Sequence, residues 1–383
     1  MDFRQAYSAL ELPKLIDASE RMKVTLIPGQ KLSNDLVRVW IGLQQANPDL
    51  SSPYFHPEFT KIIAAVRHDV EVAVLESDGK IVAFFPFQRE QREIGEPVGG
   101  VISDYHGLIC AQDFRFLPSE LLKQTRLIAW NFDHLPTSQL SFAPFHSSIE
   151  LSPQIDLSRG YDAYVRQRRG AGSKQIKKIG NLLRRIEREV GPLRFVADST
   201  DAALLGTVLG WKSDQYRHSG KGDLVAPGWI REAVDRIFAT HADGCSGMLS
   251  LLYAGDRLIA GHFGMRSRQV WHYWFPSYDP QAAKYSPGLI LLLKMAKHAP
   301  AIGAQIIDLG KGLSPYKERL MNSCSSLASG RVEPSWRSFR RRAWRTLRSR
   351  LGNSPFGPPA RVALEWLRPR SRMSDGARGN REF

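Results

Sequence analysis

Two segments of the sequence share one β-hairpin pattern. Residues 70–90, VEVAVLESDGKIVAFFPFQRE, and residues 247–267, GMLSLLYAGDRLIAGHFGMRS, each contain an apolar run, a short polar turn and a second apolar run. Such runs, joined by a turn that contains glycine, predict paired antiparallel strands. Ala83 in the first segment matches Ala260 in the second, at an offset of 177 residues. That offset is about one domain length, so the pattern predicts two similar modules in tandem.

Similar elements are expected around both hairpins. Around the first, the pattern predicts a helix at 31–47, a helical segment at 117–135 and a strand-like segment at 139–144. Around the second, it predicts helices at 201–218, 227–242 and 286–299, and strands at 270–275 and 304–310. This succession is typical of an α/β (α+β) protein.

The length agrees with two modules, because 383 residues exceed one ordinary core. Hydrophobic residues make up 43% and charged residues 24%, which excludes a disordered chain, a collagen and a coiled-coil rod. We divide the chain into an N-terminal module (1–158), a basic linking helix (159–192), a C-terminal module (193–330) and an Arg-rich tail (331–383).

The net charge of +15 is concentrated in two segments. Residues 331–383 contain 14 Lys or Arg and 4 Asp or Glu, a net charge of +10. Residues 159–194 contain 11 basic and 3 acidic residues, a net charge of +8. In this second segment Ile176, Ile179, Leu183 and Ile186 form one helical stripe, which leaves a basic face. That face is either merely solvated or a surface that receives phosphate groups.

The tail has the composition of an interfacial helix. Its apolar side contains Trp336, Phe339, Trp344 and Leu347, and arginines cover the remainder. Aromatic and Leu side chains enter the lipid headgroup boundary while arginines meet anionic lipids, so an anionic membrane surface is the expected partner. The alternatives are a disordered, solvated end and a nucleic-acid contact. The lack of a recognition fold counts against nucleic acid.

The sequence also indicates the compartment. Cys110, Cys245 and Cys324 lie far apart without metal-ligand or disulfide spacing, so we expect no metal site and a reducing cytosol. The N-terminus lacks a signal peptide, and no apolar run is long enough to cross a bilayer. We therefore expect a cytoplasmic protein, with any membrane contact peripheral at the inner membrane.

The order of elements resembles the GNAT acyltransferase superfamily, and more narrowly its CelD/BcsL type, linked to cellulose and exopolysaccharide biosynthesis. The motifs that carry this resemblance are SPYFHPEF (52–59), GGVISDYHGLI (99–109), YDP (278–280), YSPG (285–288), DLGKG (308–312) and YK (316–317). It spans about residues 20–330 and implies two tandem GNAT-like modules, each a mixed, mostly antiparallel sheet flanked by helices. Their arrangement is also similar to the Fem-type peptidyltransferases.

The resemblance implies an acetyl-CoA or other acyl-CoA cosubstrate, with its pyrophosphate at a helix N-terminus formed by Tyr285, Ser286, Pro287 and Gly288. Elementary physics agrees, because a first helical turn presents unpaired N–H groups and partial positive charge. A second segment, Gln167–Gly172, matches the acyl-CoA pattern Q/R-x-x-G-x-G/A by letter. No apolar strand precedes that segment and a basic helix follows it, so we do not expect it to bind the cofactor.

Acid and base candidates lie at strand ends and in loops. Asp308 ends a strand and is the expected base, directly or through a water molecule; Tyr316 and Lys317 follow in a short loop as candidate acid and phosphate partner. The first module is expected to contribute Asp104, Tyr105 and His106 to substrate binding, and the resemblance adds Tyr278. His262 and His272 lie on predicted strands, where a lone His is more often part of the core.

The leading hypothesis is therefore an N-acyltransferase that acylates a small amine or an amino sugar of a polysaccharide pathway. One alternative is a Fem-like aminoacyltransferase that uses aminoacyl-tRNA, bound by the basic linking helix. Another is a non-catalytic component of polysaccharide synthesis that is recruited to the membrane.

Overall fold

The computed structural model describes residues 22–91, 93–220 and 222–334. In the first part of the chain the strands are β1 (Lys23–Pro28), β2 (Val70–Ser77), β3 (Lys80–Glu90), β4 (Ile94–Glu96), β5 (Ile109–Cys110), β6 (Ala129–Pro136) and β7 (His146–Asp156). Its α-helices are α1 (Asn34–Ala46), α2 (Pro57–Val66) and α3 (Pro118–Gln124). The linking segment forms α4 (Tyr161–Gly170) and α5 (Gln175–Glu189).

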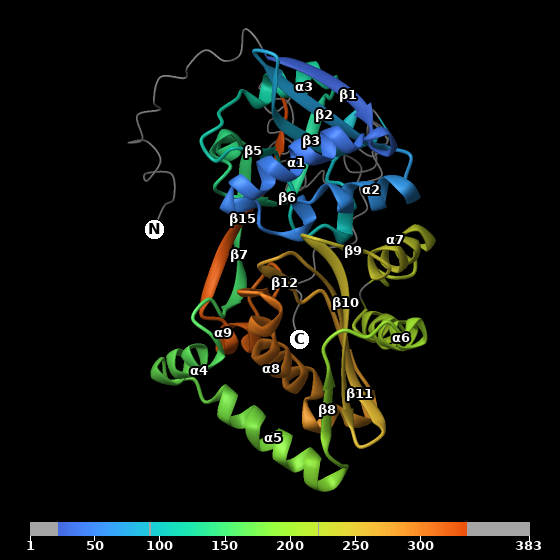
Figure 1. Ribbon diagram of the computed structural model, residues 1–383, viewed down its shortest axis with the longest axis vertical. Coiled ribbons are helices and arrows are strands. Elements are labelled where there is room, and N and C mark those ends of the chain that lie inside the picture. The colour runs from blue at the N-terminus through green and yellow to red at the C-terminus, as the bar shows by residue number, and fades with distance from the viewer. Residues whose placement is uncertain (1–21, 92, 221, 335–383) are drawn as a thin grey trace, which may run out of the picture.

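The second part repeats this mixture. Its strands are β8 (Leu193–Val196), β9 (His241–Ala242), β10 (Cys245–Ala254), β11 (Arg257–Arg266), β12 (Val270–His272), β13 (Phe275–Tyr278), β14 (Ile306–Asp308) and β15 (Ser323–Val332). Its α-helices are α6 (Ala202–His218), α7 (Gly228–Phe238), α8 (Pro287–His298) and α9 (Pro315–Leu320). The mixed class, with a mostly antiparallel sheet flanked by helices, is confirmed (Figure 1).

Both predicted hairpins are present. β2 pairs with β3, and β10 pairs with β11, in antiparallel ladders. Each ladder has one register shift, between Leu75 and Glu76 in β2 and between Leu252 and Tyr253 in β10. These two shifts are also 177 residues apart. A shift of this kind bends a strand and increases its twist, so the two modules share a local distortion as well as a pattern.

Two expectations for the segment after the first hairpin are wrong. The helix expected over 117–135 is confined to α3, and β6 follows it. The Thr125 hydroxyl bonds back to the carbonyls of Leu121 and Leu122, and Arg126 adopts a left-handed φ of 57° that no helix continues through. The segment 139–144, expected as a strand, lies in a 3₁₀ helix over Leu140–Phe145.

One sheet runs through both parts of the chain. Its strand order is β1-β2-β3-β4-β6-β15-β7-β14-β12-β11-β10-β8, with β5, β9 and β13 paired beside this path. The late strand β15 lies between β6 and β7, and β7 in turn pairs with β14. In Figure 1, β7 and β15 run together between the upper and lower groups of elements. The sequence boundaries at 158, 192 and 330 stay a prediction.

Helices cover both faces of this sheet. α1 and α2 of the first part and α6 and α7 of the second share one apolar core on one face. On the other face, α5 and α8 cover the second half of the sheet, and α3 covers the first half. Alternation along strands separates these cores: in β2, Val72 and Val74 join one, and Ala73 and Leu75 the other.

The tail predicted over 331–383 lies outside the described residues from residue 335 onward. Within the described ranges, no helix combines the length and apolar character needed to span a membrane.

The packing of α6 on β11 gives a testable prediction. A Cβ at Gly261 would overlap the Val208 side chain, so Gly261→Ala should lower the free energy of unfolding by about 1–3 kcal/mol. Val208→Ala removes the overlapping atoms, so the double variant should be less destabilised than the sum of the two single variants, as measured by urea unfolding. Gly247→Ala is the control: its Cβ would overlap the Ile237 carbonyl oxygen, and Val208→Ala should not relieve it. Simple additivity at Gly261 would contradict this packing.

Candidate functional site

A row of polar side chains crosses the centre of the sheet. His272 on β12, Asp308 on β14 and Gln154 on β7 occupy one register position of three neighbouring strands. Residues directly opposite each other in a sheet point to the same face. Their neighbours Trp271 and Ile307 point to the opposite face, into the core around α8. The polar row therefore lies on the face covered by the core of α1, α2, α6 and α7.

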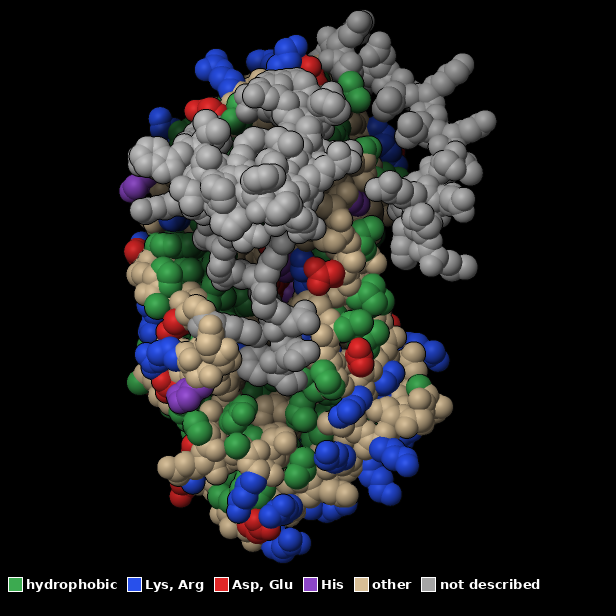
Figure 2. Space-filling view, turned by 180° about the vertical axis from the view of Figure 1, so that it is seen from behind, with side chains coloured by type: hydrophobic (Ala, Val, Ile, Leu, Met, Phe, Trp, Pro, Cys, Tyr) green, Lys and Arg blue, Asp and Glu red, His purple; other side chains and the backbone are tan. Residues whose placement is uncertain are grey.

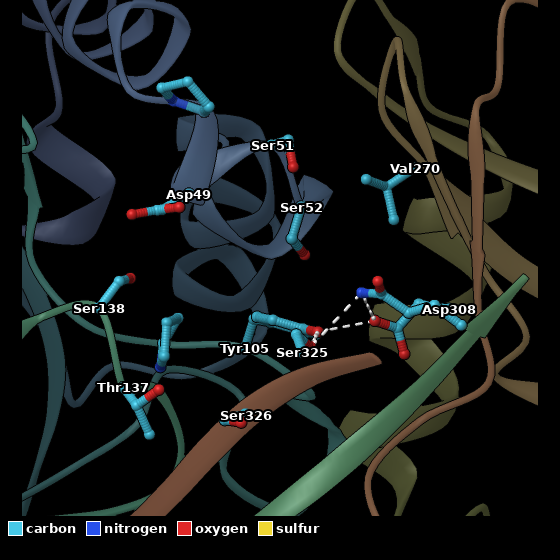
Figure 3. A pocket seen from close by; sticks show the side chains of 13 residues that line it. Asp49, Ser51, Ser52, Tyr105, Thr137, Ser138, Val270, Asp308, Ser325 and Ser326 are labelled. Atoms are coloured by element: carbon cyan, nitrogen blue, oxygen red, sulfur yellow. Dashed lines mark hydrogen bonds between the residues drawn. The ribbon is translucent and has the colours of Figure 1, made fainter. Parts of the chain in front are cut away.

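Asp308 is the centre of a hydrogen-bond network (Figure 3). Its Oδ1 accepts the Ser152 hydroxyl at 2.8 Å and the Gly310 N–H at 2.8 Å. Its Oδ2 accepts the Tyr105 hydroxyl at 2.6 Å and the Gln154 amide at 3.0 Å. The carboxylate is 1% exposed, so these donors replace water around a buried charge.

The network fixes two protonation states. Burial raises the pKa of Asp308, but the electrostatic interaction with His272 and the donated hydrogen bonds together lower it by more, and the net pKa lies below the ordinary 3.8. Burial, together with the adjacent Asp308 charge, raises the pKa of Tyr105 well above 10.0. Asp308 is therefore an anion and Tyr105 a neutral donor at neutral pH.

A cavity of about 290 Å³ opens beside this network, between the two parts of the chain (Figure 3). Asp49, a run of hydroxyl side chains and the Asp308 network line it. The hydroxyls are those of Ser51, Ser52, Tyr105, Thr137, Ser138, Ser325 and Ser326. A lining so rich in hydroxyl groups suits a ligand that itself carries many hydrogen-bonding groups.

The structure brings together two predicted site residues from distant parts of the sequence. Tyr105 and Asp308 are 203 residues apart and form a direct hydrogen bond in the cavity wall. Asp104 is buried beside them, with its Oδ1 4.0 Å from His134 Nε2. His106 Nε2 accepts the backbone N–H groups of Asp133 and His134, at 3.1 Å each, and burial lowers the pKa of His106 to about 3. Its nitrogen thus holds backbone, not substrate.

The predicted pyrophosphate site lies at the start of α8. Pro287 is the first helical residue, and Ser286 before it has a left-handed φ of 49° without a side-chain capping bond. A non-glycine residue in this conformation is strained, and such residues are frequent at ligand sites. Tyr285 is buried and donates its hydroxyl to Glu189 of α5 at 2.7 Å. The Tyr278 ring lies 3.9 Å from where a Cβ of Gly288 would be, so Tyr278 belongs to this end of α8 and not to the cavity.

Lys317 holds a loop in place. Its buried ammonium donates to the carbonyls of Gly310, Lys311 and Gly312, at 2.9, 3.4 and 3.1 Å. The Gly310 N–H in turn donates to Asp308, so Lys317 helps to hold this donor of the network in position. Tyr316 is partly buried and packs with the α8 side of the sheet.

The remaining sequence motifs lie elsewhere. Gln167–Gly170 form the last turn of α4, and the expectation that Gln167–Gly172 does not bind the cofactor stays a prediction. Among the described residues, no cluster of His, Cys, Asp and Glu has the composition to hold a metal ion.

Sequence reasoning missed several groups of this site, namely Ser52, Ser152, Gln154, His272 and Ser325. Ser52 lies in the 52–59 motif, but nothing there distinguishes it from the other polar residues. The alternate residues Ser152 and Gln154 are the signal that could have been found, because they alternate with Leu151, Pro153 and Ile155 and give one strand a polar face. His272 was expected in the core; it is 1% exposed, yet its ring borders the network.

Residues 173–318 match the family model of an acetyltransferase (GNAT) domain. The match contains α8 and its N-terminal end, β14 with Asp308, and most of α9. It covers less than half of the chain, and no curated protein matches the sequence significantly. The GNAT resemblance is thus confirmed for a domain of this chain, and the narrower CelD/BcsL resemblance stays a prediction.

Solved structures show the same fold over most of the chain. FemX matches with a TM-score of 0.53 and 11% identity, covering 81% of this chain and 96% of that one. The C-terminal domain (DUF2156) of a protein assigned as a lysylphosphatidylglycerol synthetase, from Agrobacterium fabrum, matches with a TM-score of 0.50 and 12% identity over 79% and 92%. L-PGS from Bacillus licheniformis gives 0.50 and 11% over the same shares. At these identities the likeness concerns fold alone: a GNAT-like arrangement.

Asp308→Asn tests the buried charge. We expect the variant to lose about 2–3 kcal/mol of unfolding free energy near pH 7, because a neutral amide cannot satisfy four donors. The folded-state pKa of Asp308 is lowered, so its ionised form stabilises the fold above the ordinary pKa of 3.8, and this stabilisation is lost as pH falls through the lower, folded value. The gap between wild type and variant should therefore narrow below about pH 4.

Urea unfolding across the acid range measures this gap. Asp256→Asn, in the exposed turn between β10 and β11, is the matched control and should track wild type at every pH. A gap at Asp308 that does not change with pH would show that the carboxylate is not held ionised.

Proposed function

We propose that this chain is an N-acyltransferase that moves an acetyl or other acyl group from acyl-CoA to an amino group. The observation that carries the proposal is the position of Tyr273. Its backbone N–H donates to the Asp308 carbonyl at 2.8 Å, and its hydroxyl donates to the Gly288 carbonyl at 3.1 Å. One residue thus links the predicted donor site at α8 to the polar cavity. The acetyltransferase (GNAT) domain match over residues 173–318 supports the same reaction class.

The strand pattern supports a path for the donor. β12 pairs in parallel with β14 as far as His272 and Asp308, and Tyr273 makes the next bond. Beyond it, β13 pairs with β11, and no other described strand pairs with β13. An unpaired strand edge offers N–H and C=O groups to an extended ligand, and the pantetheine arm of CoA is such a ligand.

The start of α8 suits the phosphates of the donor. The N–H groups of Leu289 and Ile290 bond the Ser286 carbonyl and Pro287 has no N–H, so the support comes from the charge of the helix end and not from a row of free N–H groups. The helix presents partial positive charge at this end. The Arg185 and Lys284 cations lie over the Tyr285 ring, 5.7 and 4.8 Å from its centre, and add positive charge nearby.

The cavity supports an amino-sugar acceptor. Its many hydroxyl side chains can exchange hydrogen bonds with sugar hydroxyls, and the half-buried Asp49 offers a carboxylate to an ammonium group. An acceptor in polysaccharide synthesis, at the inner face of a membrane, is the extension that follows from the CelD/BcsL resemblance.

The reaction forms an amide C–N bond and breaks the thioester C–S bond, so the amine loses a proton and the thiolate gains one. Asp308 already accepts four hydrogen bonds and has a lowered pKa, so we assign it to holding Tyr105 and its surroundings in place. Tyr316, on the α8 side of the sheet, is the proposed donor to the thiolate. Lys317 keeps the loop behind Asp308 in position.

Gly288→Ala tests the donor site. A Cβ there has only ordinary contacts, at 3.9 Å to Tyr278 and 4.0 Å to Tyr273, so the variant should fold normally. The added methyl group occupies the space that a phosphate needs at the helix end, and we expect acetyl-CoA to bind at least about tenfold more weakly, a cost of about 1.4 kcal/mol. Isothermal titration calorimetry measures this. Gly206→Ala on α6, where a Cβ has open space, should bind as wild type does. Wild-type protein that binds no CoA thioester would defeat the proposal.

A second candidate function uses aminoacyl-tRNA as the donor, and one surface favours it. The basic surface consists of the exposed side chains Arg166, Arg169, Lys174, Lys177, Lys178, Arg184, Arg185 and Arg188 of α4 and α5. Figure 2 shows Lys and Arg gathered at the lower right, where these helices lie. Through Arg185 the surface reaches Tyr285 at the start of α8. A continuous basic face suits a phosphate backbone.

Binding of tRNA at several salt concentrations tests this candidate. If the basic surface contacts phosphates, the triple variant Lys177→Ala, Lys178→Ala, Arg184→Ala should bind more weakly and flatten the slope of log K against log salt by about 2. The pair Arg231→Ala, Arg236→Ala on α7 is the control and should change neither quantity. Binding of acetyl-CoA with no binding of tRNA would exclude this second function and favour the first.

A further inference from the structure

We propose that Ser52 and His272 form the proton relay of this reaction: the Ser52 hydroxyl takes a proton from the acceptor amine and passes its own proton to His272 Nε2. The inference rests on the N-acyl transfer proposed above. The amine nitrogen forms the C–N bond, the C–S electron pair leaves on the thiolate, and the amine proton ends on His272, which returns it to solvent once product has left.

The geometry of the pair supports the relay. Ser52 Oγ lies 3.0 Å from His272 Nε2, although the two residues are 220 positions apart in sequence. Ser52 comes from the first part of the chain and lines the cavity, whereas His272 lies on β12 behind it. Figure 3 shows the Ser52 hydroxyl directed toward the part of the cavity that contains Tyr105 and Asp308. The Ser52 hydroxyl thus connects the imidazole of His272 to the cavity.

The imidazole has an unused nitrogen. Among the described residues no group bonds His272 Nδ1, and the side chain is 1% exposed. A buried polar atom without a partner is costly, and a functional role is one reason for it to persist. The rings of Tyr54 and Tyr105 pack edge-on against the imidazole, with centroids 5.0 and 5.4 Å away, and fix its orientation.

The surrounding charges favour a proton on this ring during the reaction. Burial lowers the pKa of His272 from 6.5, so the ring is neutral and able to accept a proton at neutral pH. The Asp308 and Asp104 carboxylates raise the pKa of His272 and stabilise the imidazolium once it forms. His134 acts in the other direction and lowers the pKa of His272. The titratable groups that face the ring are Asp308 on β14, Asp104 and Tyr105 in the loop before β5, Tyr54 before α2 and His134 on β6. His262 on β11 contacts only the His272 backbone carbonyl, at 3.1 Å.

Other groups at the cavity are less suited to accept the proton. Asp308 is saturated by four donors, and Tyr105 donates to it. The Ser325 hydroxyl lies 2.7 Å from the Tyr105 hydroxyl and so belongs to the same network. Ser52 instead joins the cavity to an imidazole that burial keeps neutral and able to accept a proton.

Steady-state kinetics with acetyl-CoA and glucosamine, followed by thiol release, test the relay. Ser52→Ala should lower kcat about 10²- to 10³-fold and leave acetyl-CoA affinity unchanged. Ser52→Thr, which keeps the hydroxyl, should retain most of the wild-type kcat. Ser119→Ala, at an exposed position of α3 outside the cavity lining, should behave as wild type. Ser52 also accepts the Tyr54 N–H at a long 3.4 Å, so thermal melting must show that both Ser52 variants fold.

The pH profile separates chemistry from structure. Because His272 must be neutral to accept a proton, wild-type kcat should fall with acid below pH 6.5, and His272→Gln should lose this acid limb as well as rate. A purely structural role would lower kcat and keep the limb. Full activity in Ser52→Ala and His272→Gln, in an enzyme whose wild type turns over, would overturn the relay and leave the proposed function intact. A wild type without turnover would instead overturn the proposed function, and the relay with it.

Two measurements need no turnover rate. The relay requires that Ser52 donate to an unprotonated Nε2, so nitrogen NMR of the resting protein should find the proton of His272 on Nδ1; a proton on Nε2 would overturn the proposal. Mass spectrometry after incubation with acetyl-CoA should show no acetyl group on Ser52. A covalent acetyl group there, absent from Ser52→Ala, would make Ser52 a nucleophile instead of a relay.

Discussion

The backbone ladder between β7 and β15 is the interaction on which the site depends. β15 bonds β6 on one side and β7 on the other, and β7 continues the sheet into β14. Without this ladder, the sheet would divide into β1-β2-β3-β4-β6-β15 and β7-β14-β12-β11-β10-β8, each with an exposed edge. With it, Ser325 lies opposite Ser152, and Gln154 lies opposite Asp308, so the polar row has a fixed register. A slip by one residue in any of these strands would turn its member of the row toward the opposite core.

The buried charge of Asp308 adds a second constraint. A carboxylate taken out of water is stable only where donors replace the water, and here those donors come from β7, from the loop that carries Tyr105 and from Gly310. They meet only when both parts of the chain are in place. The buried charge is therefore stable in one relative arrangement of the two parts. The same arrangement forms the cavity and places Ser52 against His272.

Local patterns made much of the fold predictable. The hairpins were readable because each turn and its two strands are contiguous, and α8 because Ser286 and Pro287 mark its start. Asp308 and Tyr105 stood out as polar residues that interrupt apolar segments, and the structure joins them. The segment 117–135 was misread because its apolar residues fit a helix, whereas the left-handed Arg126 that ends the helix has no sequence signal.

Long-range pairing was not predictable in this way. Nothing in the composition of β15 indicates that it fits between β6 and β7, since its partners lie about 170 or more positions away. His272 reads as a core residue for the same reason, because its partner Ser52 is 220 positions distant. The periodicity of a single sequence indicates local helices and strands, but it does not indicate which distant segments pair with each other.

The place of β15 at the end of the described chain also bears on how the protein folds. During synthesis β6 and β7 emerge close together, yet they do not pair with each other in the final sheet, because β15, which comes much later in the chain, lies between them. Both edges stay unpaired, separated by the short 3₁₀ helix Leu140–Phe145, until β15 has been synthesised. Contacts of such long sequence separation fold slowly and leave unpaired edges exposed to aggregation. The network around Asp308, which includes Ser325 of β15, is therefore complete only after β15 has inserted between β6 and β7.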